Sequence, residues 1–331
     1  MPLDKVLVIG SNSFSGASFV DYALRQDAYV VGTSRSPEPA DFFLPYKWSD
    51  AQSNFEFHQL DLNKDLDQII DLLDQHQPAY VVNFAAQSMV GQSWEHPEHW
   101  FQTNVVATVK LHDKLRQFEC LKRYVHITTP EVYGSTEGFI KESTEFYPST
   151  PYAVSRAAAD MSLLSFHNAY DFPVIFTRAA NVFGPGQQLY RIIPRTVLYI
   201  KLGKQLQLHG GGHSERSFIH IEDVSAATWA CMTRGQSGQC YHISTNEIVS
   251  IRELVHGICA KLDVNFEDCV EVVGERLGKD AAYKLDSGKI RSELSWVDNI
   301  SLDKGLDQCI AWVNKNFDQM KDQPLDYIHK P

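Results

Sequence analysis

The feature that most constrains the fold is an alternation, through the first half of the chain, of short apolar runs with longer amphipathic stretches. Alternating strands and helices are typical of a parallel sheet covered by helices, so we expect the α/β class. The runs predict strands at 6–9, 29–32, 55–59, 80–84, 123–128 and 174–178. The stretches between them predict helices near 15–26, 64–76, 98–118 and 151–170.

A glycine pair, Gly10 and Gly16, follows the first predicted strand and predicts a dinucleotide site. A strand that turns tightly into a helix presents free backbone N–H groups and a positive dipole end to a pyrophosphate. Ser13 replaces the middle glycine of the pattern, so the motif alone also fits an ordinary strand–turn–helix. Its place in the first unit of an alternating chain favours a Rossmann-type doubly wound parallel sheet. The expected cofactor contacts in this segment are Gly10, Asn12, Ser13, Phe14, Ser15 and Gly16.

The sequence pattern of the chain changes after residue 180. Gly- and Pro-rich loops at 183–186 and 209–212 precede two helical patterns, near 250–262 and 302–316. We therefore expect a dinucleotide-binding domain over 1–180, with a return segment near 217–245. A smaller C-terminal lobe over 181–331 would mainly bind the substrate.

Composition excludes several classes of function. With 30 basic and 41 acidic residues the net charge is −11, which argues against a general affinity for nucleic acid or for an anionic membrane. No apolar run is long enough for a membrane span or a signal segment, so we expect a cytoplasmic protein without a membrane partner. The six cysteines form no C-x-x-C pair, which favours reduced structural thiols over disulfides or a metal site.

The choice of cofactor depends on the turn after the second predicted strand, where a carboxylate would bind a ribose 2′-OH and a cation a 2′-phosphate. The turn contains Ser34 and Arg35 and no carboxylate. The donor fork of Arg35 favours NADP, with NAD as the alternative if Arg35 is only a solvated loop residue. Asp61 and Leu62, after the third strand, are candidate adenine contacts, and Asp61 is equally suited to cap the next helix.

Tyr152 and Arg156 lie four residues apart in a predicted helix that Thr150 caps and Pro151 begins, so they share one face. A phenol with a pKa of about 10 is a poor base at neutral pH, but a neighbouring cation favours its ionised form. Arg156 is also suited to hold ribose hydroxyls. Taken alone, such a pair is more often an ordinary surface pair on a helix.

Together with Glu131, these motifs resemble those of the extended short-chain dehydrogenase/reductase family, specifically its nucleotide-sugar 4,6-dehydratases. The resemblance covers nearly the whole length of the chain. The segments that carry it are 10–16, 83–88, 128–134, 152–156, 177–185, 216–223 and 286–296.

The resemblance implies that Thr129, Glu131, Tyr152 and Arg156 are catalytic. Tyr152 would take the proton of the sugar O4, with Thr129 bonded to the same oxygen. Glu131 would then remove the C5 proton, water would leave from C6, and the product would be a 4-keto-6-deoxy sugar. The cofactor is implied to stay tightly bound and to be recycled. Further cofactor contacts implied by the family are Ala85, Ala86, Tyr152, Arg156 and Ala179.

Two positions depart from the pattern of the dTDP-glucose enzymes. Pro130 stands where those enzymes usually have an Asp that protonates the departing C6 hydroxyl, and proline cannot donate a proton. The proton would then come from Glu131 or from a bound water. GDP-mannose dehydratases also lack this Asp, which makes GDP-linked sugars more attractive as substrates. Arg156 replaces the usual Lys, which keeps the charge but excludes a proton relay through this side chain.

The family alignment also implies contacts to a nucleotide-diphosphate-sugar substrate, namely Gln87, Ser88, Asn181, Arg191, His209, Arg216 and Arg276. The arginines offer charge-assisted bonds to phosphate, although each alone is more often a surface salt-bridge partner. His209 falls where the family often stacks an aromatic ring on the base. Its spacing to His213 does not favour metal ligation, because the intervening glycines disfavour a helical His pair. Gln87 and Ser88 are nearly as well suited to packing at the end of the fourth strand.

The family further implies a homodimer through the helices near 98–118 and 151–170, where Ala157–Ala159 would permit close approach. Two alternatives to a dehydratase remain. One is a nucleotide-sugar epimerase or decarboxylase on the same scaffold. The other is a non-catalytic dinucleotide-binding regulator, against which the intact pair of Thr129 and Tyr152 argues.

Overall fold

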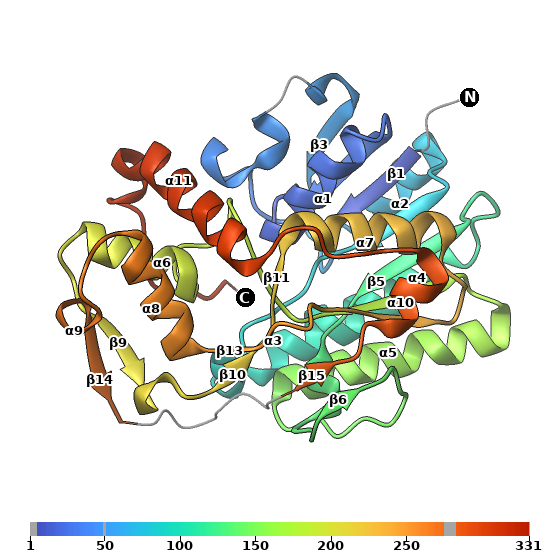
Figure 1. Cartoon of the computed structure of the whole chain (residues 1–331). Helices are drawn as coiled ribbons and strands as arrows, with labels where there is room; N and C mark the ends of the chain where they lie inside the picture. Colours follow the sequence, from blue (N-terminus) through green and yellow to red (C-terminus); the bar gives the residue numbers. More distant parts are fainter. Residues whose placement is uncertain (1–4, 49–50, 275–282, 331) are drawn as a thin grey trace.

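The computed structural model describes residues 5–48, 51–274 and 283–330, and its centre is a seven-stranded parallel sheet (Figure 1). The strand order is β12-β7-β5-β4-β1-β2-β3. The chain runs outward from β1 through β2 to β3 and then continues on the other side of β1 with β4. The crevice at the carboxyl ends of β1 and β4 is therefore the switch point at which such sheets bind ligands. The strands are β1 (Lys5–Ile9), β2 (Tyr29–Ser34), β3 (Phe55–Gln59), β4 (Tyr80–Asn83), β5 (Arg123–Ile127), β7 (Val174–Ala179) and β12 (Cys240–Ile243).

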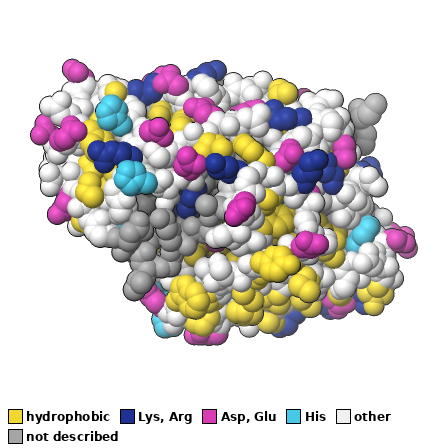
Figure 2. Space-filling model, turned by 60° about the horizontal axis from the view of Figure 1, so that its bottom comes forward, with side chains coloured by type: hydrophobic (Ala, Val, Ile, Leu, Met, Phe, Trp, Pro, Cys, Tyr) yellow, Lys and Arg dark blue, Asp and Glu magenta, His cyan; other side chains and the backbone are white. Residues whose placement is uncertain are grey.

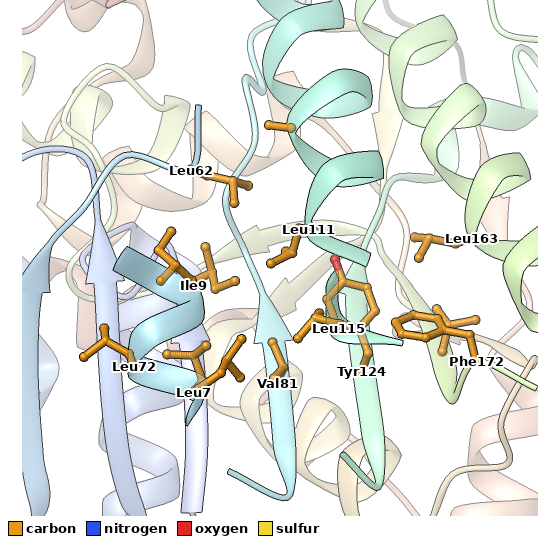
Figure 3. Packing of buried hydrophobic residues seen from close by; sticks show 14 of the residues in the cluster. Leu7, Ile9, Leu62, Leu72, Val81, Leu111, Leu115, Tyr124, Leu163 and Phe172 are labelled. Atoms are coloured by element: carbon orange, nitrogen blue, oxygen red, sulfur yellow. The ribbon is translucent and has the colours of Figure 1, made fainter. Parts of the chain in front are cut away.

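Helices cover both faces of this sheet because successive strand residues face opposite sides. In β1, Leu7 and Ile9 belong to one core and Val6 and Val8 to the other. Figure 3 shows the first core, in which Leu111 and Leu115 of one helix and Leu163 of another lie over the strands. The second core packs against α1, which in turn contacts α7. The covering helices are α1 (Phe14–Leu24), α2 (Leu66–His76), α3 (Pro97–Phe101), α4 (Thr108–Leu115), α5 (Pro151–Tyr170) and α7 (Ile221–Arg234).

A second lobe has its own core, in which apolar residues of α6, α8 and α11 meet. The second lobe consists of α6 (Ile192–Lys201), β9 (Leu206–His209), α8 (Ile251–Lys261), α9 (Phe266–Cys269), β14 (Val270–Val273) and α11 (Leu302–Met320). Short strands and one helix connect it to the main sheet. They are β6 (Phe139–Ile140), β8 (Asn181–Phe183), β10 (Glu215–Arg216), β11 (Phe218–His220), β13 (Val249–Ser250), β15 (Lys284–Leu285) and α10 (Gly288–Leu294).

The six predicted strands are confirmed, each within two residues at its ends. The helix predicted over 98–118 is wrong as one continuous helix, because a π-helical stretch, η5 (Gln102–Ala107), separates α3 from α4. The division of the chain into domains at residue 180 stays a prediction. None of the helices in the described ranges is long and apolar enough to cross a bilayer.

Candidate active site

The glycine turn between β1 and α1 is built by close backbone approach. Gly10 has φ +84°, and a Cβ there would lie 2.8 Å from the backbone nitrogen of Ala85. A Cβ on Gly16 would lie 2.1 Å from the carbonyl oxygen of Gly10, so neither position tolerates a side chain. Ser13 has φ −73° and caps α1, because its Oγ accepts the Gly16 N–H at 3.1 Å and donates to the Gly10 carbonyl at 2.7 Å. The free N–H groups at the start of α1 remain suited to a pyrophosphate.

A cleft at the carboxyl ends of the strands collects most of the predicted cofactor contacts. The predicted residues that line it are Gly10, Asn12, Ser13, Ser34, Arg35, Asp61, Leu62, Ala85 and Ala86, joined by Gln87. The lining residues that sequence reasoning missed are Ile9, Ser36, Leu60, Asn63, Phe84 and Thr103. Phe14, Ser15 and Gly16 lie in the first turn of α1 and Ala179 at the end of β7, outside this lining.

Asn12 organises the loop that follows β2. Its Nδ2 donates to the carbonyls of Ser36 at 2.8 Å and Pro37 at 3.0 Å, and its backbone N–H donates to Ser34 Oγ at 3.1 Å. The side chain of Asn12 therefore holds the segment that brings Arg35 to the cleft. This loop contributes Ser34, Arg35 and Ser36 to the lining, and none of these three is a carboxylate.

The interpretation of Asp61 as a helix cap is wrong. Its Oδ1 accepts the backbone N–H of Asn63 at 2.9 Å within a turn, and the N-cap of α2 is Asp65. Asp61 remains in the lining of the cleft, beside the buried Leu62. Asn63 is tied across to Thr103 by a 3.0 Å hydrogen bond.

The candidate catalytic residues meet where β5 ends and α5 begins. Thr129 caps the short helix η6 (Pro130–Tyr133) by accepting the N–H of Glu131 at 3.3 Å. Thr150 caps α5 in the same way, which places Tyr152 in its first turn. A hydrogen bond links Thr129 to Tyr152. Pro130 is buried at the first position of η6, where its missing N–H costs nothing.

The ionisation of Tyr152 is set by opposing effects. Burial raises the pKa of Tyr152 above 10.0, and Arg156 opposes this rise. Glu131 raises the pKa of Tyr152 further, whereas Arg191 lowers it. These four side chains therefore share one electrostatic environment, although Arg191 lies at the start of α6 in the second lobe.

Arg156 is buried to 2 % exposure and lies against the end of β5. Its Nη2 donates to the carbonyl of Ile127 and lies 3.5 Å from His126 Nε2. Its Nε is buried and has no hydrogen-bond partner among the described residues. A buried donor without a partner is costly, and a bound group with acceptor oxygens would satisfy it. The site thus fits a cofactor at this point.

A buried ion pair behind Arg156 was missed by sequence reasoning. Asp160, one helical turn after Arg156, accepts bonds from Arg178 Nη2 at 2.8 Å and Thr128 Oγ1 at 3.0 Å. Two buried guanidinium groups thus lie near one buried carboxylate. The spacing of Arg156 and Asp160 indicates only that these two side chains are neighbours on one helix, and it does not indicate the pairing with Arg178.

The predicted substrate contacts are more dispersed. Arg191 is the N-cap of α6, 5.4 Å from the ring of Tyr190, and it is brought near Tyr152. Asn181, in β8, donates to the carbonyl of Ser217 at 3.3 Å. Arg216, in β10, donates to the carbonyl of Glu215 at 2.8 Å.

The remaining predicted substrate contacts differ in their surroundings. Gln87 is 3 % exposed in the cleft, whereas Ser88 is exposed. His209 is exposed at the end of β9, with its Nδ1 3.2 Å from the carbonyl oxygen of Gly274. Arg276 lies outside the described residues.

Comparisons with known proteins agree on one family. A family model described as GDP-mannose 4,6 dehydratase matches residues 7–309. A dTDP-glucose 4,6-dehydratase of Haemophilus influenzae is 30 % identical over 330 residues, which is 93 % of this chain and 97 % of that protein. The crystal structure of dTDP-glucose 4,6-dehydratase from Bacillus anthracis in complex with NAD has TM-score 0.86 and 28 % identity, covering 95 % of this chain and 98 % of the other. MoeE5 in complex with UDP-glucose and NAD has TM-score 0.83 and 26 % identity, covering 95 % and 99 %.

Proposed function

The chain belongs to the GDP-mannose 4,6-dehydratase family, and on that premise we propose that it is a nucleotide-diphosphate-sugar 4,6-dehydratase. This lyase forms an NDP-4-keto-6-deoxyhexose from an NDP-hexose. The observation that carries the proposal is the placing of Glu131 beside Tyr152 and Thr129. Oxidation at C4 needs only the hydroxyl groups of Tyr152 and Thr129. Elimination of water across C5 and C6 also requires a base, and the carboxylate of Glu131 is suited to that role.

The cofactor proposed for the cleft is NADP, with NAD as the alternative. The start of α1 would hold the pyrophosphate, and Arg35 would face a 2′-phosphate. When bound, the nicotinamide supplies the oxidation at C4 and the reduction at C6, and it ends the cycle unchanged. The related structures of the Bacillus anthracis enzyme and of MoeE5 contain NAD, which is the alternative. Arg35→Ala should weaken NADPH binding more than NADH binding in fluorescence titrations.

Tyr152 and Thr129 act on the sugar O4. Tyr152 takes the O4 proton, and Thr129 hydrogen-bonds the same oxygen. Arg156 favours the phenolate that this step needs, because its positive charge opposes the rise in the pKa of Tyr152 that burial causes. Once C4 is a ketone the C5 proton is acidic, and Glu131 is the base that removes it.

The departing C6 hydroxyl must receive a proton from a group other than Pro130. Proline has neither a side-chain donor nor a backbone N–H. Glu131 is partly buried at the next position and carries the C5 proton after the elimination begins. Glu131 itself, or a water that it holds, therefore supplies this proton.

The substrate class is a sugar linked to a nucleoside diphosphate. Arg191 is suited to the diphosphate because its guanidinium can form charge-assisted bonds to phosphate, and it lies at the start of α6 near Tyr152. The missing Asp at position 130 favours a GDP-sugar, whereas the relative from Haemophilus influenzae is named for dTDP-glucose. A panel of GDP-, dTDP-, UDP- and CDP-hexoses assigns the base by the rate of 4-keto product formation.

Glu131→Gln tests the proposed function. The amide cannot accept the C5 proton, so we expect dehydration to fall by about two to four orders of magnitude, while oxidation at C4 still reduces bound cofactor. The measurement is product NMR together with absorbance of the reduced cofactor. Glu137→Gln, an exposed change in the loop that follows η6, is the control and should behave as wild type. Normal dehydration by Glu131→Gln contradicts the assignment, and a product that keeps the C6 oxygen or loses carbon dioxide would indicate an epimerase or a decarboxylase.

A homodimer is proposed on the face formed by α3, η5 and α5. Four apolar side chains on these elements are 38–61 % exposed, namely Phe101, Val106, Val154 and Met161. Figure 2 shows hydrophobic side chains gathered over the lower part of the view. Of the three alanines expected at the contact, Ala157 and Ala159 are buried within this chain, and Ala158 is partly exposed.

A cytoplasmic location is also proposed. All six cysteines are free thiols, and a reducing compartment keeps thiols in that state.

A further inference from the structure

The segment 321–330 leaves α11 and returns toward the centre of the molecule, where the end of the chain lies between the two lobes (Figure 1). Its exposure alternates. Leu325, Tyr327 and His329 are partly buried, whereas Asp326 and the residues after it at 328 and 330 are exposed. This period of two is typical of an extended segment that lays one side on the protein.

The first half of the segment is attached to the second lobe. Leu325 packs against the core formed by α6, α8 and α11. Asp326 Oδ1 lies 2.9 Å from Arg195 Nη2 of α6. The ring of Tyr327 meets the ring of Tyr190 edge to face, with centroids 5.5 Å apart.

The second half is attached to the dinucleotide-binding side. The carbonyl oxygen of Lys330 accepts a 2.7 Å hydrogen bond from Gln87 Nε2. His329 Nε2 lies 2.8 Å from Nδ1 of His99 in α3. The imidazole of His329 also stacks on Trp100, with centroids 5.0 Å apart and an interplanar angle of 12°. The segment therefore bridges the lobes.

The segment reaches the wall of the cofactor cleft. Gln87 lines the cleft, and its backbone N–H and carbonyl are both bonded to the side chain of Asn104, at 2.9 and 3.0 Å. Burial raises the pKa of Tyr327, and Arg35 and Arg191 oppose the rise, so both cations lie near its hydroxyl. Tyr327 of the segment thus lies near Arg35, which is assigned to the cofactor, and near Arg191, which is assigned to the diphosphate.

We propose that residues 321–330 form a latch across the cofactor cleft, and that its closure slows release of the dinucleotide. The latch rests on the proposed function only in that the cleft binds NAD or NADP. It accounts for retention of a cofactor that is regenerated in every cycle. The contacts to Gln87 and His99 are the ones that must break for the latch to open, because the contacts to α6 remain within the second lobe.

Acid should open the latch. The hydrogen bond between His99 and His329 needs one unprotonated ring nitrogen. The charged groups around this pair are His96, Glu95 and Glu98 beside or in α3, with Arg35 from the loop after β2 and Tyr327 from the latch itself.

The sign of this pH effect follows from the shift at His329. Burial lowers the pKa of His329, and His99 and Arg35 lower it further. A lowered pKa in the closed state means that closure is fully favoured above the ordinary value of 6.5 and is lost as the pH falls through the lowered value.

The test is the dissociation rate of NADPH and of NADH from the full-length protein, followed by fluorescence while an excess of the oxidised dinucleotide displaces them. His329→Ala should accelerate release about tenfold at pH 8, the loss expected for one hydrogen bond and one ring contact. His99→Ala loses the same hydrogen bond and should also accelerate release, and the double variant should be no faster than His329→Ala. Asp318→Ala, in α11 outside the latch, loses only an exposed pair with Lys321 and is the control.

Unchanged release in both histidine variants overturns the latch, and so do effects that multiply in the double variant. Wild type should release the dinucleotide faster at pH 5.5 than at pH 8, and His329→Ala should lose most of this difference. The measurement needs no sugar. A protein that shows the latch effect without dehydrating any sugar would contradict the proposed function alone, and failure to bind either dinucleotide would contradict both.

Discussion

Ser13 and Arg156 each replace the residue that a familiar pattern has at their position. Ser13 is compatible with its turn because the backbone there has φ −73°, and its hydroxyl caps α1. Arg156 keeps the positive charge beside Tyr152, but one of its nitrogens is bonded to the carbonyl of Ile127. The first replacement is explained by local geometry. The second changes which groups surround the base, and the change is measurable.

Arg156→Gln should move the pH dependence of the reaction. Burial raises the pKa of Tyr152 and Arg156 lowers it, so removal of the cation raises this pKa further. Activity rises with pH as the phenol of Tyr152 ionises. The rising limb of the plot of kcat/KM against pH should therefore shift to higher pH by about one unit or more. Arg116→Gln, which removes an exposed partner of Asp113, should leave the limb in place. A limb that stays put or moves to lower pH in Arg156→Gln contradicts this role.

Helices and strands were predictable from the sequence where their apolar residues follow one period. Six of the seven strands of the sheet are short apolar runs, and these were predicted. The edge strand β12 (Cys240–Ile243) was not predicted. The helix α7 was missed because its buried residues, among them Asp223, Ser225 and Cys231, surround much of its circumference, so that no single apolar stripe marks it. The interruption of the predicted helix 98–118 by η5 was missed because the apolar pattern of a sequence does not distinguish a π-helical turn from an α-helical one.

Asn104 gives this interruption a function. The η5 stretch buries Thr103 and Asn104 together, and the side chain of Asn104 bonds Ser155 of α5 as well as the backbone of Gln87. Asn104→Ala removes two bonds that fix the cleft wall, each of about 1 kcal/mol, so cofactor affinity should fall about tenfold. Isothermal titration with NADPH and NADH measures this. Gln102→Ala, at an exposed position of the same stretch, should not change the affinity, and an equal effect in both variants contradicts the argument.

Contacts between distant parts of the chain could not be predicted from the sequence. The predicted cleft residues, such as Ser34, Asp61 and Ala85, were found because they lie at or just after the end of a strand, and the carboxyl ends of parallel strands share one edge. The approach of Arg191 to Tyr152, and of Lys330 to Gln87, depends on how the second lobe lies on the first. The pairing of Asp160 with Arg178 likewise joins a helix to a strand, and no local spacing encodes it.

Substitution of Met161 tests whether the chain forms the proposed homodimer. Met161 is 61 % exposed on α5, beside the apolar side chains assigned to the dimer face. Met161→Glu places a charge in a contact that should be apolar, so the protein should become monomeric in light scattering. Met161→Leu keeps the surface apolar and should remain dimeric. A monomeric wild type, or a dimer that survives the charge, contradicts the assigned face.

The central claim is that one site oxidises C4, eliminates water across C5 and C6, and reduces C6. The most direct measurement is the fate of deuterium placed at C4 of the accepted NDP-hexose, followed by NMR and mass spectrometry of the product. The account predicts a 4-keto-6-deoxy sugar that has lost one water and carries the deuterium in its C6 methyl group. A product that retains the C6 oxygen, or deuterium that is found at C4 or in released cofactor, would contradict it.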